Sequence, residues 1–181
     1  MVVLEKIRTE CDRASDIIRS TRATLRQQVS KPTLIITTEL LSELETLVTD
    51  RLAVLGVSIA KFVDPGAAHF VADRTQISQA LYNLLDNSLQ AIDASGKAGA
   101  VTVDVRPRMP AEISFEVRDT GPGFPAETSG SQLPPYISTR IDGSGIGLSI
   151  VRSVAEAHGG RLSIERRDGT TCVRFTIASN N

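Results

Sequence analysis

The sequence contains no tryptophan, and its phenylalanines and tyrosines make up only 4% of its 181 residues. So few aromatic rings leave little surface on which nucleic-acid bases can stack. The net charge of −1 also removes the bulk electrostatic attraction that drives most nucleic-acid binding. We therefore expect no nucleic acid among the partners of this chain.

Cysteines and long apolar runs are scarce as well. The two cysteines, Cys11 and Cys172, are far apart and show no metal-ligand spacing, which predicts free thiols in a reducing compartment. No apolar run approaches the roughly 20 residues that span a membrane, and the chain opens with no signal-peptide pattern. We expect a cytoplasmic protein, attached to a membrane only through upstream regions that this sequence does not contain.

The N-terminal region has the pattern of a helix that needs a partner. From Leu4 to Leu25, apolar or small residues recur at alternating intervals of three and four, which is heptad spacing. We favour a partner on another chain, and a helix folded back onto its own domain is the alternative. Because Pro32 disfavours helical geometry before it, we place a boundary there and expect two units, 1–30 and 31–181.

The second unit mixes short strand patterns with amphipathic helices. Helices are expected from Thr38 or Ser42 to Leu55, over 74–94 and over 145–158, each ended by glycine. Strands are expected at 33–36, 57–63, 69–72, 101–106, 113–119, 161–166 and 171–177, and an irregular, lid-like segment at 124–142. Strands and helices do not alternate strictly, so we predict an α+β two-layer sandwich with a mixed sheet and three helices on one face.

The expected helix over 74–94 carries a first chemical motif, Asn83-Leu-Leu-Asp-Asn87. At roughly 100° per residue, the two asparagines lie one turn apart on the flank of an apolar stripe. A buried amide needs hydrogen-bond partners, and amide oxygens are suitable Mg²⁺ ligands. Taken alone, the motif also fits two solvated asparagines. The stripe comprises Ile77, Leu81, Leu84, Leu85, Ser88 and Ile92.

Two glycine-rich motifs follow. Asp119 ends an apolar strand before Thr-Gly121-Pro-Gly123, where a carboxylate can accept a hydrogen bond from an exocyclic amine and glycines let the backbone approach a planar ring. An ordinary Asp turn is the alternative. Gly143-Ser-Gly145-Ile-Gly147 opens the last helix, where free N–H groups and the helix dipole favour phosphate. Together, the three motifs predict a pocket for ATP and Mg²⁺.

In this order the motifs resemble the ATP-binding domain of sensor histidine kinases, in the wider group that includes DNA gyrase, heat-shock chaperones and mismatch-repair ATPases. The resemblance covers residues 38–177. Besides the three motifs, it includes Ala72-Asp73-Arg74, just before the asparagine helix, and His158-Gly-Gly, at the end of the last helix. It implies a Bergerat-type ATP-binding fold preceded by one long N-terminal helix. It also implies a homodimer formed through that helix, and a response-regulator receiver domain as partner.

The resemblance assigns roles to individual residues. It implies that Asn83 and Asn87 contact Mg²⁺ and phosphate, that Asp119 accepts the adenine amine and that Thr171 supports the adenine. Arg140 is the last residue of a segment, 135–140, that resembles the family's Phe-Thr-Thr-Lys, and it would reach the γ-phosphate, so Asn83 and Arg140 are the implied catalytic residues. The implied nucleotide site comprises Asn83, Asn87, Gln90, Asp119, Gly121, Gly123, Ser138, Thr139, Arg140, Gly143, Gly145, Ile146, Gly147, Leu148 and Thr171.

Two departures from the family pattern matter. Relatives that hydrolyse ATP with water have Glu at the position of Asn83, and an amide cannot act as a general base, so we expect transfer to a protein side chain, with His favoured over Ser. The family's acceptor His precedes an acidic residue on a helix before the catalytic domain, and neither His69 nor His158 has that context. Residues 4–29 resemble the second helix of the dimerisation hairpin, so the acceptor would lie upstream or on another protein.

We therefore interpret the chain as the ATP-binding catalytic domain of a two-component sensor histidine kinase. Two alternatives stay open. An ATPase-switch domain of the gyrase or chaperone type would be favoured by Glu at the position of Asn83. A non-enzymatic phosphotransfer or docking adaptor would have a decayed nucleotide site, which Asp119 and the glycine motifs argue against.

Overall fold

A computed structural model of the chain describes residues 32–108, 111–123 and 146–179. The expected N-terminal helix, the whole of the lid-like segment and the first two glycines of the last motif lie outside these residues. In the described residues the elements are β1 (Thr33–Ile36), α2 (Thr37–Leu55), β2 (Ser58–Val63), the 3₁₀ helix η1 (Pro65–Ala67), β3 (His69–Ala72), α3 (Arg74–Ser95), β4 (Ala100–Arg108), β5 (Glu112–Asp119), α4 (Ile146–Ala157), β6 (Leu162–Arg167) and β7 (Thr170–Ala178).

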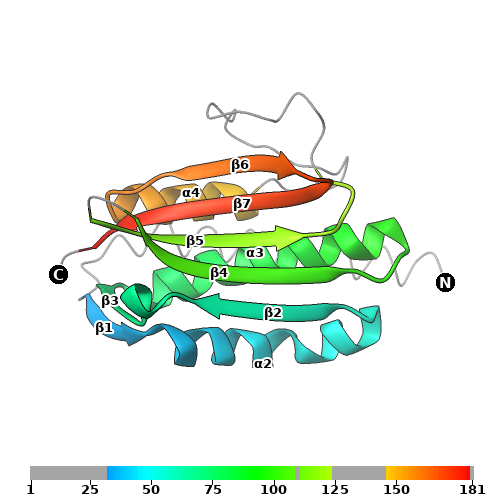
Figure 1. Ribbon diagram of the computed structural model, residues 1–181, viewed down its shortest axis with the longest axis horizontal. Coiled ribbons are helices and arrows are strands. Elements are labelled where there is room, and N and C mark those ends of the chain that lie inside the picture. The colour runs from blue at the N-terminus through cyan, green and yellow to red at the C-terminus, as the bar shows by residue number, and fades with distance from the viewer. Residues whose placement is uncertain (1–31, 109–110, 124–145, 180–181) are drawn as a thin grey trace.

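The main sheet has five strands in the order β2-β4-β5-β7-β6 (Figure 1). Strands β2 and β4 pair in parallel, and every other pair in this sheet is antiparallel, which confirms the predicted mixed sheet. The short strands β1 and β3 form a separate antiparallel pair. This separate pair was not predicted, because strand patterns show where a strand runs but not which strand it joins.

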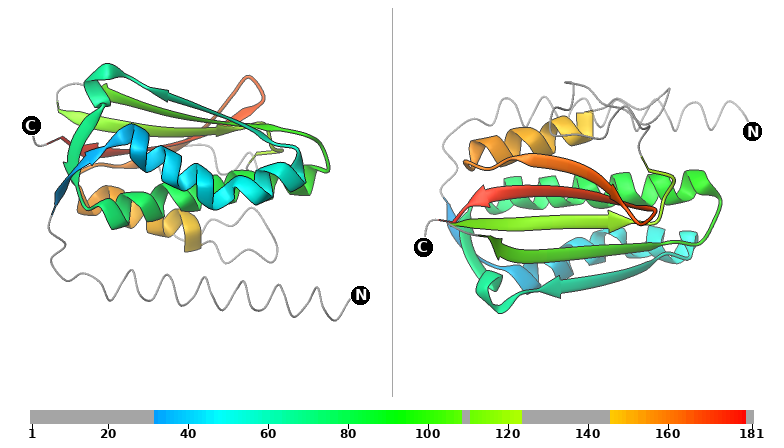
Figure 2. Two further views of the ribbon diagram at one scale, coloured as in Figure 1. Left: turned by 90° about the horizontal axis from the view of Figure 1, so that it is seen from below. Right: turned by 45° about the horizontal axis from the view of Figure 1, so that its top comes forward.

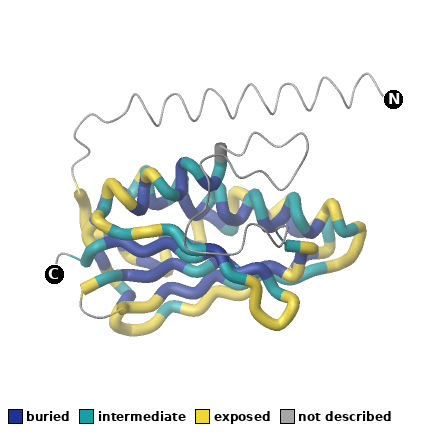
Figure 3. The backbone as a smooth tube through the Cα atoms, turned by 90° about the horizontal axis from the view of Figure 1, so that it is seen from above, coloured by how far each residue is buried: buried dark blue, intermediate teal, exposed yellow. Residues whose placement is uncertain are grey.

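The three α-helices of the described residues cover one face of the main sheet, as predicted (Figure 2). Most strand residues that face the helices are apolar, and Phe115 of β5 stacks on Phe175 of β7 with ring centroids 4.7 Å apart. All six residues of the predicted stripe on α3 are buried. In Figure 3 the buried residues of this layer between the helices and the sheet are dark blue.

Neighbouring residues determine both ends of α3, whereas a tertiary contact determines the start of α2. Asp73 caps α3 by accepting a hydrogen bond from the backbone N–H of Gln76 at 3.1 Å, and Gly96 ends the helix with φ of 64°. Helix α2 begins at Thr37, before the predicted caps, and no side chain caps it. Instead, the backbone N–H of Thr37 donates to the carbonyl of Ala68 at 3.0 Å, so a long-range contact replaces the cap.

Strand β4 is longer than predicted, because it continues through Pro107 to Arg108. Proline cannot donate to a strand ladder, so its presence argued for a turn. The neighbouring strand β2 ends where Val63 pairs with Val105, and Pro107 therefore has no β2 residue beside it. The ladder between β4 and β5 continues on the other side, with Pro107 paired to Ile113.

None of the helices in the described residues is both long enough and apolar enough to span a membrane.

Candidate nucleotide site

Asp119 and Thr171 lie side by side on the helix-facing side of the sheet. Asp119 is the last residue of β5, and Thr171 is its register partner on β7. Both side chains are buried, with exposed fractions of 4% and 3%. One Asp119 carboxylate oxygen accepts the backbone N–H of Gly121 at 2.9 Å, and the other accepts the hydroxyl of Ser88, on α3, at 3.3 Å. The carboxylate thus has two donors and capacity for more.

Burial raises the pKa of Asp119 above its ordinary value of 3.8. Three groups oppose that shift by favouring the charged form: the Gly121 N–H, the Ser88 hydroxyl and the charge of Arg166. A buried carboxylate with few partners is costly to keep, and it therefore marks a place where a ligand donor can bind.

The hydroxyl oxygen of Thr171 is buried and has no hydrogen-bond partner in the described part of the chain. Buried hydroxyls in folded proteins are normally paired, so an unpaired one next to an acceptor carboxylate needs an explanation. The adenine ring supplies both donors and acceptors along one edge. The pair of Asp119 and Thr171 therefore fits an adenine base.

The turn after Asp119 packs directly against α3. A methyl group at Gly121 would lie 2.8 Å from the Asp119 carboxylate and 2.9 Å from the Cβ of Ala91, which real structures do not tolerate. Gly123 has φ of 79°, a conformation that favours glycine. The glycine at position 121 thus lets the backbone pass close to the carboxylate, whereas the predicted approach to a planar ring stays a prediction.

The two asparagines lie on the part of α3 that faces the start of α4. A Cβ at Gly147, in the first turn of α4, would lie 3.4 Å from the Asn87 amide. The side-chain nitrogen of Asn83 is buried and has no hydrogen-bond partner among the described residues. Amide groups in such a position can bind phosphate oxygens and a divalent cation, so the donor set fits ATP with Mg²⁺. No group of three or more His, Cys, Asp or Glu side chains in the described ranges forms a metal site by itself.

One contact on α3 was not predicted. Asp86, within the asparagine motif, forms an ion pair with Arg51 of α2 and accepts a hydrogen bond from the Gln90 amide at 2.6 Å. Gln90, a candidate nucleotide contact, is thus engaged with its own helix. The predicted helical spacing places Asp86 and Gln90 one turn apart, but nothing local indicates Arg51.

The remaining candidates divide into two groups. Leu148 is 8% exposed and packs in the core, so only its backbone is available to a nucleotide. Ile146 begins α4. The other candidates, Ser138, Thr139, Arg140, Gly143 and Gly145, lie outside the described residues.

His158 forms two hydrogen bonds that give it a structural role. Its Nδ1 donates to the carbonyl of Val154 at 2.8 Å, and its Nε2 accepts the backbone N–H of Asp73 at 3.3 Å. These partners require the neutral ring, and they connect the end of α4 to the start of α3.

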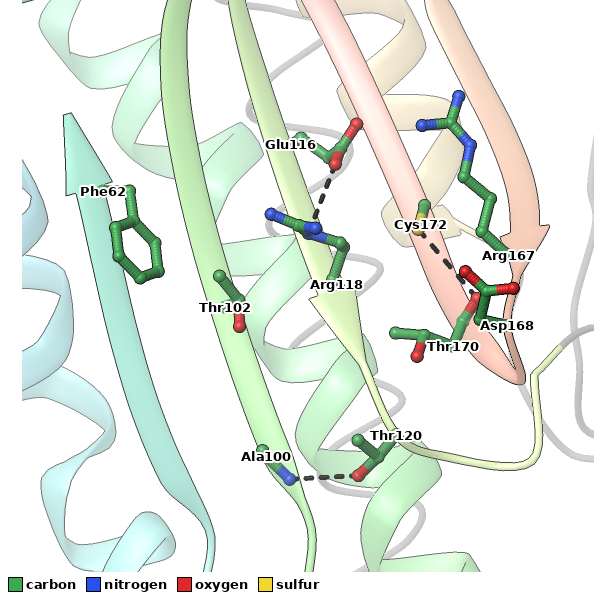
Figure 4. Close-up of a pocket in the computed structure, with 10 residues that line it drawn as sticks. All are labelled: Phe62, Ala100, Thr102, Glu116, Arg118, Thr120, Arg167, Asp168, Thr170 and Cys172. Atoms are coloured by element: carbon green, nitrogen blue, oxygen red, sulfur yellow. Dashed lines mark hydrogen bonds and ion pairs between the residues drawn. The ribbon is translucent and has the colours of Figure 1, made fainter. Parts of the chain in front are cut away.

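A hollow on the opposite face of the sheet is separate from this site (Figure 4). Its lining includes Phe62, Glu116, Arg118 and Cys172, and the helices lie behind the sheet in this view. Two of the charged groups there form an ion pair, with Arg118 Nε 3.3 Å from Glu116 Oε1. That nitrogen is nevertheless buried without a hydrogen-bond partner of good geometry in the described residues, so the hollow differs from the nucleotide site in its ion pairs and not in lacking unpaired atoms.

Comparisons with known proteins agree with this geometry. Residues 72–181 match the family of histidine kinase-, DNA gyrase B-, and HSP90-like ATPases. The chain is 34% identical over 175 residues to the sensor protein FixL of Bradyrhizobium diazoefficiens, an alignment that covers 96% of this chain and 34% of FixL. It is 30% identical to the sensor histidine kinase ZraS of Klebsiella oxytoca, with 88% of this chain and 34% of ZraS covered. The chain thus spans about a third of these relatives.

Solved structures show the same architecture. The catalytic domain of histidine kinase ThkA superposes with a TM-score of 0.71 at 28% identity, which covers 82% of this chain and 96% of that domain. ThkA in complex with the response regulator TrrA superposes with a TM-score of 0.77 at 26% identity, which covers 98% of this chain and 51% of ThkA. The chain therefore belongs to the histidine kinase-, DNA gyrase B-, and HSP90-like ATPase family, as a catalytic ATP-binding domain of the sensor histidine kinase type.

Proposed function

We propose that this chain binds ATP with Mg²⁺ and donates the γ-phosphoryl group to a histidine on a dimerisation hairpin, for relay to a response-regulator aspartate. The observation that carries the proposal is the buried Asp119 carboxylate beside the unpaired hydroxyl of Thr171. Family membership supplies the reaction class, and the site supplies the reason for adenine.

In this proposal, Asp119 accepts a hydrogen bond from the exocyclic amine of adenine while Thr171 bonds to a ring nitrogen. The Gly121–Gly123 turn provides the flat backbone surface beside the base. Guanine has a carbonyl oxygen where adenine has its amine, so guanine would place two acceptors against each other. The site therefore discriminates against GDP and GTP.

Asn83 and Asn87 are proposed to bind the phosphates and Mg²⁺, with Arg140 at the γ-phosphate. When bound, Mg²⁺ neutralises phosphate charge as the β–γ phosphoanhydride bond breaks. A bond then forms between phosphorus and the imidazole nitrogen of the acceptor, and ADP leaves. Because Asn83 is an amide and cannot deprotonate water, hydrolysis is slow compared with transfer.

Isothermal titration calorimetry with Mg²⁺ tests the binding part of the proposal. We expect the chain to bind ADP and a non-hydrolysable ATP analogue, and to bind GDP at least about tenfold more weakly because of the mismatched acceptor. Equal affinity for ADP and GDP would contradict the base assignment. If the chain binds none of the three nucleotides, the proposal is overturned.

Phosphotransfer is tested with γ-labelled ATP. The chain alone should gain no stable phosphohistidine, and a purified dimerisation hairpin that carries an acceptor His should become labelled when added. Asn87→Ala should abolish this labelling, whereas Gln79→Ala, two turns earlier on α3, should not. Acid-labile label on His69 or His158 would show that the acceptor lies within the chain after all.

The dimer and the response regulator are proposed from the heptad pattern of residues 4–25 and from the likeness to ThkA, which has been solved with TrrA. In the complete protein, charged substitutions at Ile7 and Ile18 should impair phosphotransfer and leave ADP affinity unchanged. Loss of ADP affinity in those variants would show instead that this helix folds back onto the catalytic domain.

A further inference from the structure

Arg166 lies in the same cross-strand row as the two base-contacting candidates. It is the register partner of Thr171 across β6 and β7, and Thr171 is the register partner of Asp119 across β7 and β5. Register partners point to the same side of a sheet, so all three side chains emerge on the side that the helices cover. Arg166 itself is exposed at the rim of this row.

The guanidinium of Arg166 connects two backbone segments. One terminal nitrogen donates to the carbonyl of Pro122, in the turn after β5, and the other donates to the carbonyl of Gly169, in the β6–β7 hairpin, at 3.3 Å. Figure 1 shows the segment after β5 rising along this hairpin. Only arginine has donors arranged to reach two carbonyls in one plane while keeping its charge.

The opposite side of the turn is fixed by β4. The backbone N–H of Thr120 donates to the carbonyl of Ala100 at 3.2 Å, and the Thr120 hydroxyl accepts the Ala100 N–H at 3.0 Å. In the described residues, the Arg166 contact is the corresponding attachment on the β6 side. The turn that faces the base is thus held from both sides.

Gly123 makes the close approach of Arg166 possible. A Cβ at Gly123 would overlap the Arg166 guanidinium, and it would lie 3.1 Å from the Thr171 hydroxyl. The second glycine of the motif therefore leaves room for the guanidinium at the border of the base site, and its φ of 79° also disfavours a side chain there.

The charge of Arg166 acts on the Asp119 carboxylate. The other groups that adjoin Asp119 are neutral: the Ser88 hydroxyl and Ala91 from α3, Val101 from β4 and Thr171 from β7. In the described residues, Arg166 is thus the cation that lowers the pKa of Asp119 against the effect of burial.

We propose that Arg166 is a positioning residue for the nucleotide base, which ties the turn after Asp119 to the hairpin that carries Thr171. The inference rests on the proposed adenine site and adds a residue to it. Arg166 acts through Asp119 and the turn backbone. Its removal should therefore weaken adenine binding and change how that binding depends on pH.

Arg166→Met, Arg166→Lys and the control Arg167→Met test this role. Arg167 is the adjacent residue on β6, pairs with Glu165 and lines the hollow on the other face. ADP affinity is measured by calorimetry between pH 5 and pH 8, and thermal stability is measured without nucleotide. Arg166→Met should weaken ADP binding roughly three- to tenfold at pH 7, as for loss of a charge-assisted contact.

The pH profile separates positioning from a general structural role. Loss of the cation raises the pKa of Asp119 further, so in Arg166→Met the acid decline of ADP affinity should begin at higher pH than in the wild type. Arg166→Lys keeps the charge and should restore the wild-type pH profile but not the full affinity. Arg167→Met should match the wild type in ADP affinity and in its pH profile.

These experiments distinguish failure of the positioning role from failure of the proposed function. If the wild type binds no ADP, the adenine site itself is wrong. If the wild type binds ADP and Arg166→Met binds it with the same affinity and pH profile, the positioning role is overturned. Tighter binding by Arg166→Met would show that the guanidinium obstructs the base, which would also overturn it.

Discussion

Asp104 and Asp119 are two buried aspartates on neighbouring strands, and they face opposite sides of one sheet. Their exposed fractions are 5% and 4%, so burial does not distinguish them. On the open face, Asp104 is ion-paired with Arg106 at 2.5 Å and with Arg118 at 3.4 Å. On the helix-covered face, Asp119 forms no ion pair within the described part of the chain and has a hydroxyl and an N–H as donors.

This difference extends across the two faces. On the open face, Glu116 pairs with Arg118 (Figure 4) and also with Arg174, so these charges form a network. The covered face contains the unpaired Thr171 hydroxyl and the unpaired Asn83 nitrogen. Paired charges stabilise a protein surface, whereas unpaired buried groups reduce stability unless a ligand completes them. Arg118 Nε on the open face is also buried without a hydrogen-bond partner in the described residues, but it lies 3.3 Å from the Glu116 carboxylate. A buried aspartate without an ion pair, next to an unpaired hydroxyl, therefore distinguishes the functional face.

When the buried carboxylate of Asp119 is replaced, the largest expected effect is on nucleotide affinity. Asp119→Asn places an N–H group where the adenine amine needs an acceptor, in a site shielded from water. The loss should be about 1–3 kcal/mol, or roughly tenfold or more in ADP affinity, measured by calorimetry. Asp104→Asn is the matched control and should bind ADP as the wild type does. Equal ADP affinity for Asp119→Asn and the wild type would refute the assignment.

A smaller effect is expected at Thr171. Thr171→Val keeps the shape of the side chain but removes the hydroxyl, so ADP affinity should fall by a few-fold, about 1 kcal/mol. Stability without nucleotide should rise slightly, because an unpaired buried oxygen is removed. Thr176→Val is the control on the same strand: the Thr176 hydroxyl accepts the Arg161 N–H at 3.2 Å, so this variant should lose stability and keep its affinity. Thermal melts and ADP titrations of both variants would show whether the two effects separate.

The sequence predicted much of this fold because the relevant signals are local. Helical spacing identified the buried stripe of α3, Gly96 marked the end of that helix, and Asp119 appeared at the end of an apolar strand. Resemblance to a family, and not spacing, supplied the role of Thr171.

What the sequence did not predict depends on contacts between distant residues. Arg166 reaches Pro122 across 44 positions, and Ser88 reaches Asp119 across 31. Thr37 begins α2 through the carbonyl of Ala68, and no helix-start pattern encodes that partner. These contacts depend on the order of strands in the sheet, in which β5 pairs with β7 and not with β6, the next strand along the chain. Local patterns contain no information on this order.

On the open face, the expected effect is on stability and not on function. Asp104→Asn removes a buried acceptor of two arginines, and those arginines are partly exposed and can be hydrated instead. The free energy of unfolding should therefore fall by only about 1 kcal/mol, with ADP affinity unchanged. Urea unfolding measures the loss. A large loss of ADP affinity would show that the two faces are coupled through β4 and β5.

The smallest expected effect concerns stability and pH, and it sharpens the difference between the two aspartates. Because the pKa of Asp119 is raised on folding, the folded state binds more protons than the unfolded state between the two pKa values. This contribution therefore lowers stability as pH rises from below 3.8 through the raised pKa. Asp119→Asn has no such group, so without nucleotide its stability relative to wild type should be greater at pH 7 than at pH 3.

Unfolding by urea at both pH values, without nucleotide, measures this change. The substitution that most weakens ADP binding should thus be the one that makes the empty domain relatively more stable at neutral pH. This trade-off is expected where a protein keeps a charge buried for its ligand. If the relative stability of Asp119→Asn instead decreased between pH 3 and pH 7, the folded protein would be satisfying the Asp119 carboxylate by itself. Asp119 would then resemble Asp104, and its incomplete pairing would no longer indicate a ligand.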